Sequence, residues 1–301
     1  MAIQIISVEV SFMKNPIGIY YAYWEKEWSA DFLPYIKKVK ELGFDDLEIN
    51  AGAVVDMTSA ERKNLAAAAK DAGITLSYCI GLPAKYDLSS ADSAVRKAGS
   101  EFVGKMLDGI HEMDGKVIGG IIYATWPMVG APTYDEKMQM RARSIESLRE
   151  ILKKAEQNDI KYFREKVNRV EQCIMNTAAE GVEYLRELGS PNAKLLLDTF
   201  HMNIEEDSIG DAIRSAKGYV GHFHIGEPNR KTPGTGRMPW GEIFGALKCI
   251  DYDGMIVMEP FIKAGGQVGK DIKVFRDLSN NASAEEMDEM AAAAASFVKR
   301  G

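Results

Sequence analysis

Four polar residues that can bind a metal or move a proton each end a short apolar run. They are Glu165, Asp198, His224 and Glu259, which close the segments KYFRE, KLLLD, YVGHFH and MIVME. Consecutive members lie about one βα repeat apart, roughly 30 residues. A parallel α/β barrel carries its active site at the C-terminal ends of its strands. This spacing therefore predicts that the fold gathers the four side chains in one place.

Three carboxylates and one imidazole form a mostly oxygen site, which suits Mn²⁺, Co²⁺ or Mg²⁺ better than a thiolate-bound zinc ion. Open coordination positions would be left for substrate oxygens. Each residue also has a structural interpretation: Asp198 could cap the next helix, His224 could be a hydrogen-bonded core residue, and the glutamates could pair with basic neighbours. The four together, on successive strand ends, favour a metal site.

Other polar and aromatic residues follow the same strands. Glu171, His201 and Arg230 could hydrogen-bond a polyol and polarise its carbonyl, or Glu171 could be an N-terminal helix charge and Arg230 part of a solvated loop. His222 lies two residues from His224 and so shares its strand face, as a core residue or as a support of the site. Aromatic residues that could stack on a sugar, or simply pack, are Tyr20, Trp24, Trp126 and Trp240.

Eight β-type runs alternate with helical patterns and must position these residues. The runs are residues 17–23, 46–50, 75–80, 117–123, 161–167, 194–198, 219–224 and 255–259. Thr58 and Glu61 have capping-box spacing, and Gly43, Gly73, Gly115 and Gly189 are placed to end helices. A final helix is expected over residues 284–300. We therefore predict an α/β fold, a single-domain (β/α)8 TIM barrel, over an open doubly wound sheet, because no glycine-rich turn follows the first strand.

The bulk composition excludes several classes of protein. Hydrophobic residues make up 46% of the 301 residues, so a large core can be buried. A net charge of −7 and the lack of a basic patch argue against nucleic acid as a partner. Three widely spaced cysteines suit a reducing compartment, and neither a signal peptide nor a membrane-spanning stretch is found. A cytoplasmic protein without a membrane partner is expected.

Several stretches of the chain, from residue 17 to about residue 280, resemble the ketose 3-epimerase family, which includes the D-tagatose and D-allulose (D-psicose) 3-epimerases on a xylose-isomerase-like barrel. They are GIYYAYWE, IGGIIYATWP, VNRVEQCIMNTAAEG, LLLDTFHMNIEEDSIGDAIR, GHFHIGEPNRKTPGTGRMPW and VMEPF. Residues 1–12 precede the region of resemblance and are interpreted as an N-terminal extension of the single catalytic domain, with no catalytic role.

The resemblance implies a homodimer or homotetramer that binds a free ketose, with Mn²⁺ or Co²⁺ held by Glu165, Asp198, His224 and Glu259. It also implies that Glu165 and Glu259 are the acid/base pair, that Glu171, His201 and Arg230 hold the ketose O1 to O3 region, and that Tyr20 and Trp126 line the pocket. The C3 hydrogen of a ketose is acidic because it is α to the C2 carbonyl, and a metal would stabilise the enediolate formed on its removal. Epimerisation at C3 of the D-allulose/D-fructose or D-tagatose/D-sorbose type is therefore expected. Residues 81–87 and 128–134 are the loops suspected of choosing among ketoses.

Three other functions remain open from the residues. One is another sugar isomerase or an inosose dehydratase-type lyase on the same barrel, and one is a catalytically weak sugar-binding barrel. The third, a DNA-repair endonuclease, would need more histidines than the four present and a basic surface.

The strand that carries Glu165 departs from the family pattern. Arg164 and Lys166 flank Glu165 where relatives carry aliphatic residues, and Val170 replaces an aromatic. If Glu165 points into the barrel, alternation sends Arg164 and Lys166 toward the helix layer, where an unpaired charge is costly. The expectation is that they snorkel, pair with acidic helix residues or shift the strand, and that Arg164→Leu with Lys166→Val raises stability or activity.

Overall fold

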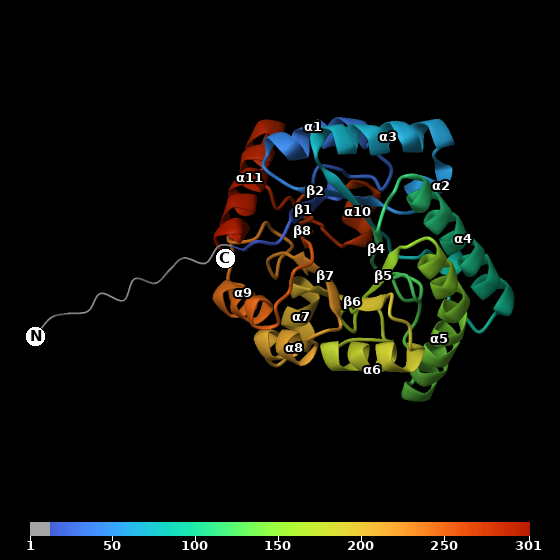
Figure 1. Cartoon of the computed structure of the whole chain (residues 1–301). Coiled ribbons are helices and arrows are strands. Elements are labelled where there is room, and N and C mark those ends of the chain that lie inside the picture. Colours follow the sequence, from blue (N-terminus) through green and yellow to red (C-terminus); the bar gives the residue numbers. More distant parts are fainter. Residues whose placement is uncertain (1–12) are drawn as a thin grey trace, which may run out of the picture.

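Eight parallel strands surround the centre of the molecule, and helices form an outer layer (Figure 1). The computed structural model of the chain describes residues 13–301. The strands are β1 (Ile17–Tyr20), β2 (Asp46–Asn50), β3 (Thr75–Cys79), β4 (Val117–Ile118), β5 (Lys161–Glu165), β6 (Ala193–Asp198), β7 (Val220–Ile225) and β8 (Ile256–Met258). Their order is β3-β2-β1-β8-β7-β6-β5-β4, and a parallel bridge between Cys79 and Gly119 joins the two ends. The predicted (β/α)8 barrel is confirmed.

The helices that follow the strands have local sequence signals at their ends. They are α1 (Leu33–Glu41), α2 (Ala53–Asp56), α3 (Ser59–Ala72), α4 (Ser93–Glu112), α5 (Tyr134–Gln157), α6 (Ala178–Leu188), α7 (Thr199–Glu205), α8 (Ile209–Ser215), α9 (Trp240–Cys249), α10 (Gly266–Asp271) and α11 (Ala284–Arg300). The capping box of Thr58 and Glu61 begins α3 as predicted, and left-handed Gly73 and Gly189 end α3 and α6. After α4, however, Asp114 rather than Gly115 adopts the positive φ, so the role predicted for Gly115 is wrong.

Among the predicted strands, the first and the fourth are shortened most. The first becomes a buried 3₁₀ turn at Tyr21–Tyr23. The fourth is regular only over Val117–Ile118, because Gly120 has a φ of 109° and leaves the ladder. A Cβ at Gly120 would lie 2.3 Å from the carbonyl oxygen of Ile80, so only glycine allows the chain to approach β3 this closely. Beyond Gly120, Ile121 and Trp126 reach the pocket described below, while Thr125 forms a parallel bridge with Leu82.

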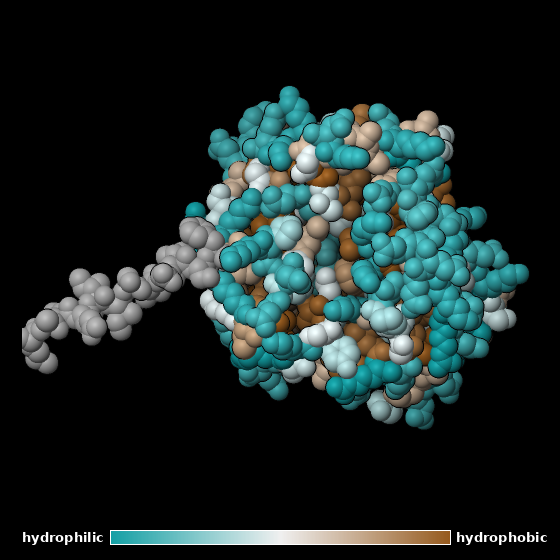
Figure 2. All heavy atoms as spheres, in the orientation of Figure 1, coloured by the Kyte–Doolittle hydropathy of each residue, from teal (hydrophilic) through white to brown (hydrophobic). Residues whose placement is uncertain are grey.

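The surface of the barrel is mostly hydrophilic on the helices, with apolar residues gathered between them and toward the middle of the face in view (Figure 2). Among the helices of residues 13–301, none combines the length and apolar character needed to cross a bilayer. The expectation for residues 1–12 lies outside the described residues.

Candidate active site and metal centre

The four predicted ligands come together at the C-terminal ends of neighbouring strands. Glu165, Asp198 and His224 lie on β5, β6 and β7, and Glu259 directly follows β8. All four are buried, with exposed fractions of 8% or less. Ligand atoms of Glu165, His224 and Glu259 lie within 4.8 Å of one another, and so do those of Glu165, Asp198 and His201. Glu165 thus joins two overlapping groups into one cluster.

The donor atoms of this cluster fit a divalent cation. Both ring nitrogens of His224 are buried without a hydrogen-bond partner, and Nδ1 lies 3.7 Å from Oε1 of Glu259. Oδ1 of Asp198 accepts a 2.9 Å hydrogen bond from the backbone N–H of Phe200 and caps α7, which leaves Oδ2 facing the site. Asp198 therefore has the helix-capping role considered from the sequence and still offers an oxygen to an ion. One imidazole nitrogen among carboxylate oxygens is a donor set for a hard or borderline ion.

Arg230 is part of this cluster rather than of a solvated loop. Its Nη1 lies 2.9 Å from Oδ2 of Asp198 and 3.0 Å from Oε2 of Glu259, and the residue is 6% exposed. The guanidinium carbon lies 3.8 Å from the ring centre of Phe200, a cation–π contact. Because the backbone of Arg230 has a φ of 63°, the turn after β7 sends this side chain back into the barrel mouth. Arg230 can neutralise carboxylates here and hold a substrate oxygen.

His201 lies beside Arg230 in the cluster, and Glu171 lies beyond it. Nδ1 of His201 accepts from the backbone N–H of Asn168 at 3.3 Å and lies 2.8 Å from the Asn168 side-chain amide, so the ring proton lies on Nε2. That Nε2 is 3.4 Å from Oε1 of Glu165. Glu171 accepts from Nε1 of Trp126 at 2.8 Å and from the Asn168 amide at 3.0 Å. Glu171 is held by specific partners and is not a free helix charge.

The electrostatics of the cluster favour protons or a cation. Burial, and then the charge of Glu259, raise the pKa of Glu165 well above its ordinary value. Burial also raises the pKa of Asp198, although Arg230 opposes this effect. Burial and the charge of Arg230 lower the pKa of His201 well below its ordinary value, so this imidazole is neutral. A divalent ion would relieve the mutual repulsion of the carboxylates.

A cavity of about 300 Å³ opens directly on the cluster. Tyr20 and Trp126 line it as expected, together with Glu165, Glu171, His201, Arg230 and Glu259. Trp24 and Trp240 do not: Trp24 stacks on Tyr35, and Trp240 stacks on Phe244. Of the two suspected loops, only the first contributes, through Gly81 and Pro83; residues 128–134 do not line the cavity.

Sequence reasoning missed several residues of this cavity and of the barrel interior. Trp28, Phe261, Asp271 and Ile272 line the cavity from loops and from the end of α10, where no strand-end pattern marks them. Asn50 also lines the cavity, and its position as the last residue of β2 was a signal that sequence reasoning passed over. Glu48, in the middle of β2, is fully buried beside His222 and His224. A signal did exist for Glu48: in DLEIN, polar and apolar residues alternate, which places the acidic side chains on the inner face.

Arg164 of β5 and Lys166, which follows β5, are both fully buried on the side of the helix layer. Lys166 forms a 3.4 Å ion pair with Glu206, which follows α7, although its Nζ makes no hydrogen bond. Arg164 has only a 3.4 Å hydrogen bond to the carbonyl of Lys194 and a contact with the ring of Tyr162, and its Nε and Nη1 have no partner. The expected pairing with an acidic residue is therefore found for Lys166 and not for Arg164.

Comparisons with known proteins agree on one group of relatives. A family model for xylose isomerase-like TIM barrels matches residues 36–278. The chain is 48% identical to the D-psicose 3-epimerase of Agrobacterium fabrum over 280 residues, covering 93% of this chain and 96% of that protein. It is 35% identical to the L-ribulose 3-epimerase of Mesorhizobium japonicum, with 81% of each chain covered. The crystal structure of D-psicose 3-epimerase with D-tagatose from Clostridium cellulolyticum H10 superposes with a TM-score of 0.92 at 47% identity, covering 94% of this chain and 98% of that one.

Proposed function

Because this chain belongs to the ketose 3-epimerases of the xylose isomerase-like TIM barrel family, we propose that it inverts C3 of a free ketose by moving protons through Glu165 and Glu259. The observation that carries the proposal is the placement of these two carboxylates, which come from β5 and from the end of β8 and line one cavity. D-Psicose (D-allulose) and D-fructose are the first substrates to test, followed by the D-tagatose/D-sorbose pair, because relatives of this chain are named or crystallised with psicose and tagatose.

The proton chemistry needs two carboxyl groups in different protonation states. The C3 hydrogen is acidic because it is α to the C2 carbonyl, so one glutamate can remove it as a base. The other glutamate then returns a proton to the opposite face of C3, and the centre is inverted. In the reverse direction the two residues exchange roles.

The surrounding residues position the sugar. Arg230, with several N–H groups at the cluster, and neutral His201 can donate hydrogen bonds to the substrate oxygens around O1 to O3. Glu171, held by Trp126 and Asn168, can accept a hydrogen bond from a substrate hydroxyl in the same region. Tyr20 and Trp126 provide apolar walls for the sugar ring or chain.

Glu165, Asp198, His224 and Glu259 would hold Mn²⁺ or Co²⁺, with Mg²⁺ as a third choice. Such a cation would supply Lewis acidity that stabilises negative charge on the substrate oxygens next to C3. The support for this assignment is the free Nδ1 of His224 among carboxylate oxygens.

The test is solvent exchange at C3. The Mn²⁺-loaded protein is incubated in D₂O with D-fructose, D-allulose or D-tagatose, and NMR follows deuterium at C3 and the appearance of the C3 epimer. Both are expected for at least one ketose. Replacing either carboxylate, with Glu165→Gln or Glu259→Gln, is expected to lower exchange by about 10²- to 10⁴-fold. Bound metal without exchange at C3 of any ketose would contradict the proposal and favour a lyase or a sugar-binding barrel.

A further inference from the structure

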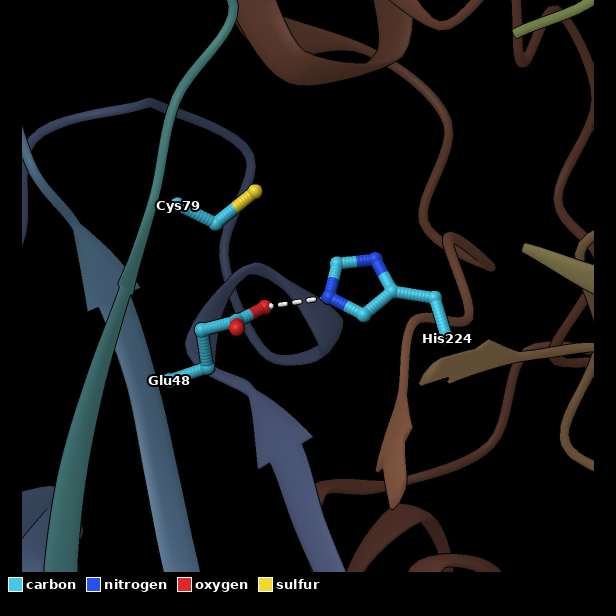
Figure 3. Close-up of side chains that lie close together, drawn as sticks. All are labelled: Glu48, Cys79 and His224. Carbon is cyan, nitrogen blue, oxygen red and sulfur yellow. Dashed lines mark ion pairs between the residues drawn. The ribbon is translucent and has the colours of Figure 1, made fainter. Parts of the chain in front are cut away.

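Beside the candidate metal ligands, the interior of the barrel holds a carboxylate in contact with two imidazoles. Glu48 of β2 is fully buried and points across the barrel toward β7 (Figure 3). Its Oε1 lies 2.8 Å from Nε2 of His222 and 3.3 Å from Oγ of Ser77, which donates its proton to Oδ2 of Asp46 at 2.7 Å. Its Oε2 lies 2.9 Å from Nε2 of His224, an ion-pair contact marked by the dashed line in Figure 3, although the two groups do not have the alignment of a hydrogen bond. Each carboxylate oxygen thus faces a different imidazole.

We propose that Glu48 is a positioning residue for the metal centre: it holds the ring of His224 so that Nε2 carries the proton toward β2 and Nδ1 presents its lone pair to Glu165 and Glu259. The inference rests on the metal site of the proposed function. An imidazole binds a metal only through a nitrogen without a proton, and the partner of the other nitrogen decides which one that is.

The surroundings of Glu48 suit this role. A buried carboxylate needs hydrogen-bond donors on both of its oxygens. The imidazole of His222 holds Oε1, which leaves Oε2 for the imidazole of His224.

Cys79 lies close enough that the same cluster could instead be a second metal site with a sulfur ligand. Ligand atoms of Glu48, Cys79 and His224 also lie within 4.8 Å of one another, and Figure 3 shows the sulfur near the carboxylate and the ring. Nε2 of His224, however, already faces Oε2 of Glu48 at 2.9 Å, so a metal held by Cys79 and His224 would have to displace this contact. The geometry thus favours support of one metal centre over a second, sulfur-containing one.

The experiment is a Co²⁺ titration of the metal-stripped protein, of Glu48→Gln and of the matched control Cys79→Ser, followed by absorbance and calorimetry. We expect one Co²⁺ per parent chain without a thiolate charge-transfer band. In Glu48→Gln the Kd for Co²⁺ should rise about 10- to 100-fold. Cys79→Ser should bind Co²⁺ as the parent does. Melting of the metal-free proteins separates a loss of affinity from a loss of fold.

Each alternative outcome is decisive. Parent-like Co²⁺ affinity in folded Glu48→Gln overturns the positioning role while leaving the metal centre intact. A charge-transfer band, or lost affinity in Cys79→Ser, overturns it in favour of a sulfur ligand. A parent that binds no Co²⁺ refutes the proposed metal centre itself.

If Glu48→Gln does not fold, ¹⁵N NMR of the parent loaded with Zn²⁺ can show which ring nitrogen of His224 carries the proton. The spectrum is simple because the chain has only four histidines. A proton on Nε2 of His224 supports the role of Glu48, and a proton on Nδ1 overturns it.

Discussion

Arg164 brings a guanidinium into the layer between β5 and the helices, where two of its nitrogens have no hydrogen-bond partner. Burial lowers the pKa of this guanidinium to about 10, which reflects the cost of keeping the charge there. Lys166, two residues along the same face, has Glu206 as a partner. Replacing Arg164 and replacing Lys166 should therefore have different effects on the stability of the protein.

Arg164→Met should stabilise the protein, because it removes a buried unsatisfied group and keeps much of the side-chain volume. Such a group costs about 1–3 kcal/mol, so the free energy of unfolding in urea should rise by about 1 kcal/mol or more. Lys166→Met is the matched control and should not stabilise, since it leaves Glu206 without its cation. Equal gains in both variants would show that pairing with Glu206 contributes nothing.

Glu165 should make the metal-free protein sensitive to pH. Its pKa in the folded chain is raised by burial and by Glu259. The protonated carboxyl therefore contributes stability that is complete below the unfolded pKa of about 4.3 and is lost as the pH rises through the folded value. Glu165→Gln cannot ionise and should avoid this loss.

In EDTA, the stability of Glu165→Gln relative to the parent should therefore increase between about pH 5 and about pH 8. Urea unfolding of both proteins at several pH values measures this difference in stability. Adding Mn²⁺ should stabilise the parent more than the variant at the higher pH. A stability difference that does not change with pH would contradict the raised pKa.

At the scale of elements, the loop between β7 and α9 is held by one buried carboxylate. Glu227 accepts hydrogen bonds from the backbone N–H groups of Gly234 and Met238, at 2.8 and 3.1 Å, and from Nε1 of Trp240 at 2.9 Å. The backbone of Arg230 is fixed by the same turn, since its N–H donates to the carbonyl of Glu227 at 2.9 Å. The position of the Arg230 guanidinium thus depends on this loop.

Glu227→Gln should raise the KM for the ketose more than it lowers kcat, because its amide group would face N–H donors and loosen the loop that carries Arg230. A loss of about 1.4 kcal/mol corresponds to a tenfold change, and a KM increase of this order is expected from steady-state kinetics. The control is Thr235→Ala on the exposed part of the same loop. An unchanged KM in Glu227→Gln would show that Glu227 is not needed to position Arg230.

At the scale of the whole molecule, the eight strands and every candidate site residue lie within residues 13–301. Deleting residues 2–12 should therefore leave the melting temperature and the rate of ketose epimerisation within about twofold of the parent. Calorimetry and product analysis check this. A loss of activity with an unchanged melting temperature would give residues 1–12 a role at the site. Assembly as a homodimer or homotetramer stays a prediction that light scattering can measure.

Much of this molecule is readable from local sequence. Capping by Thr58 and Glu61 and the left-handed glycines 73 and 189 set helix ends, because these signals act within a few residues. The strand-end positions of Glu165, Asp198, His224 and Glu259 predicted a common site, because a parallel barrel brings all C-terminal strand ends to one face. Their catalytic and metal-binding roles remain proposals.

Only the tertiary structure decided which side chains meet across the barrel. Glu48 reaches His222 and His224, more than 170 residues away, and no local pattern encodes which strands face one another once the sheet closes. The same holds for Arg164 and Lys166: alternation sends both into the helix layer, yet only the packing of α7 gives Lys166 a partner. Periodicity determines the face on which a side chain lies, whereas its contacts depend on the closure of the whole barrel.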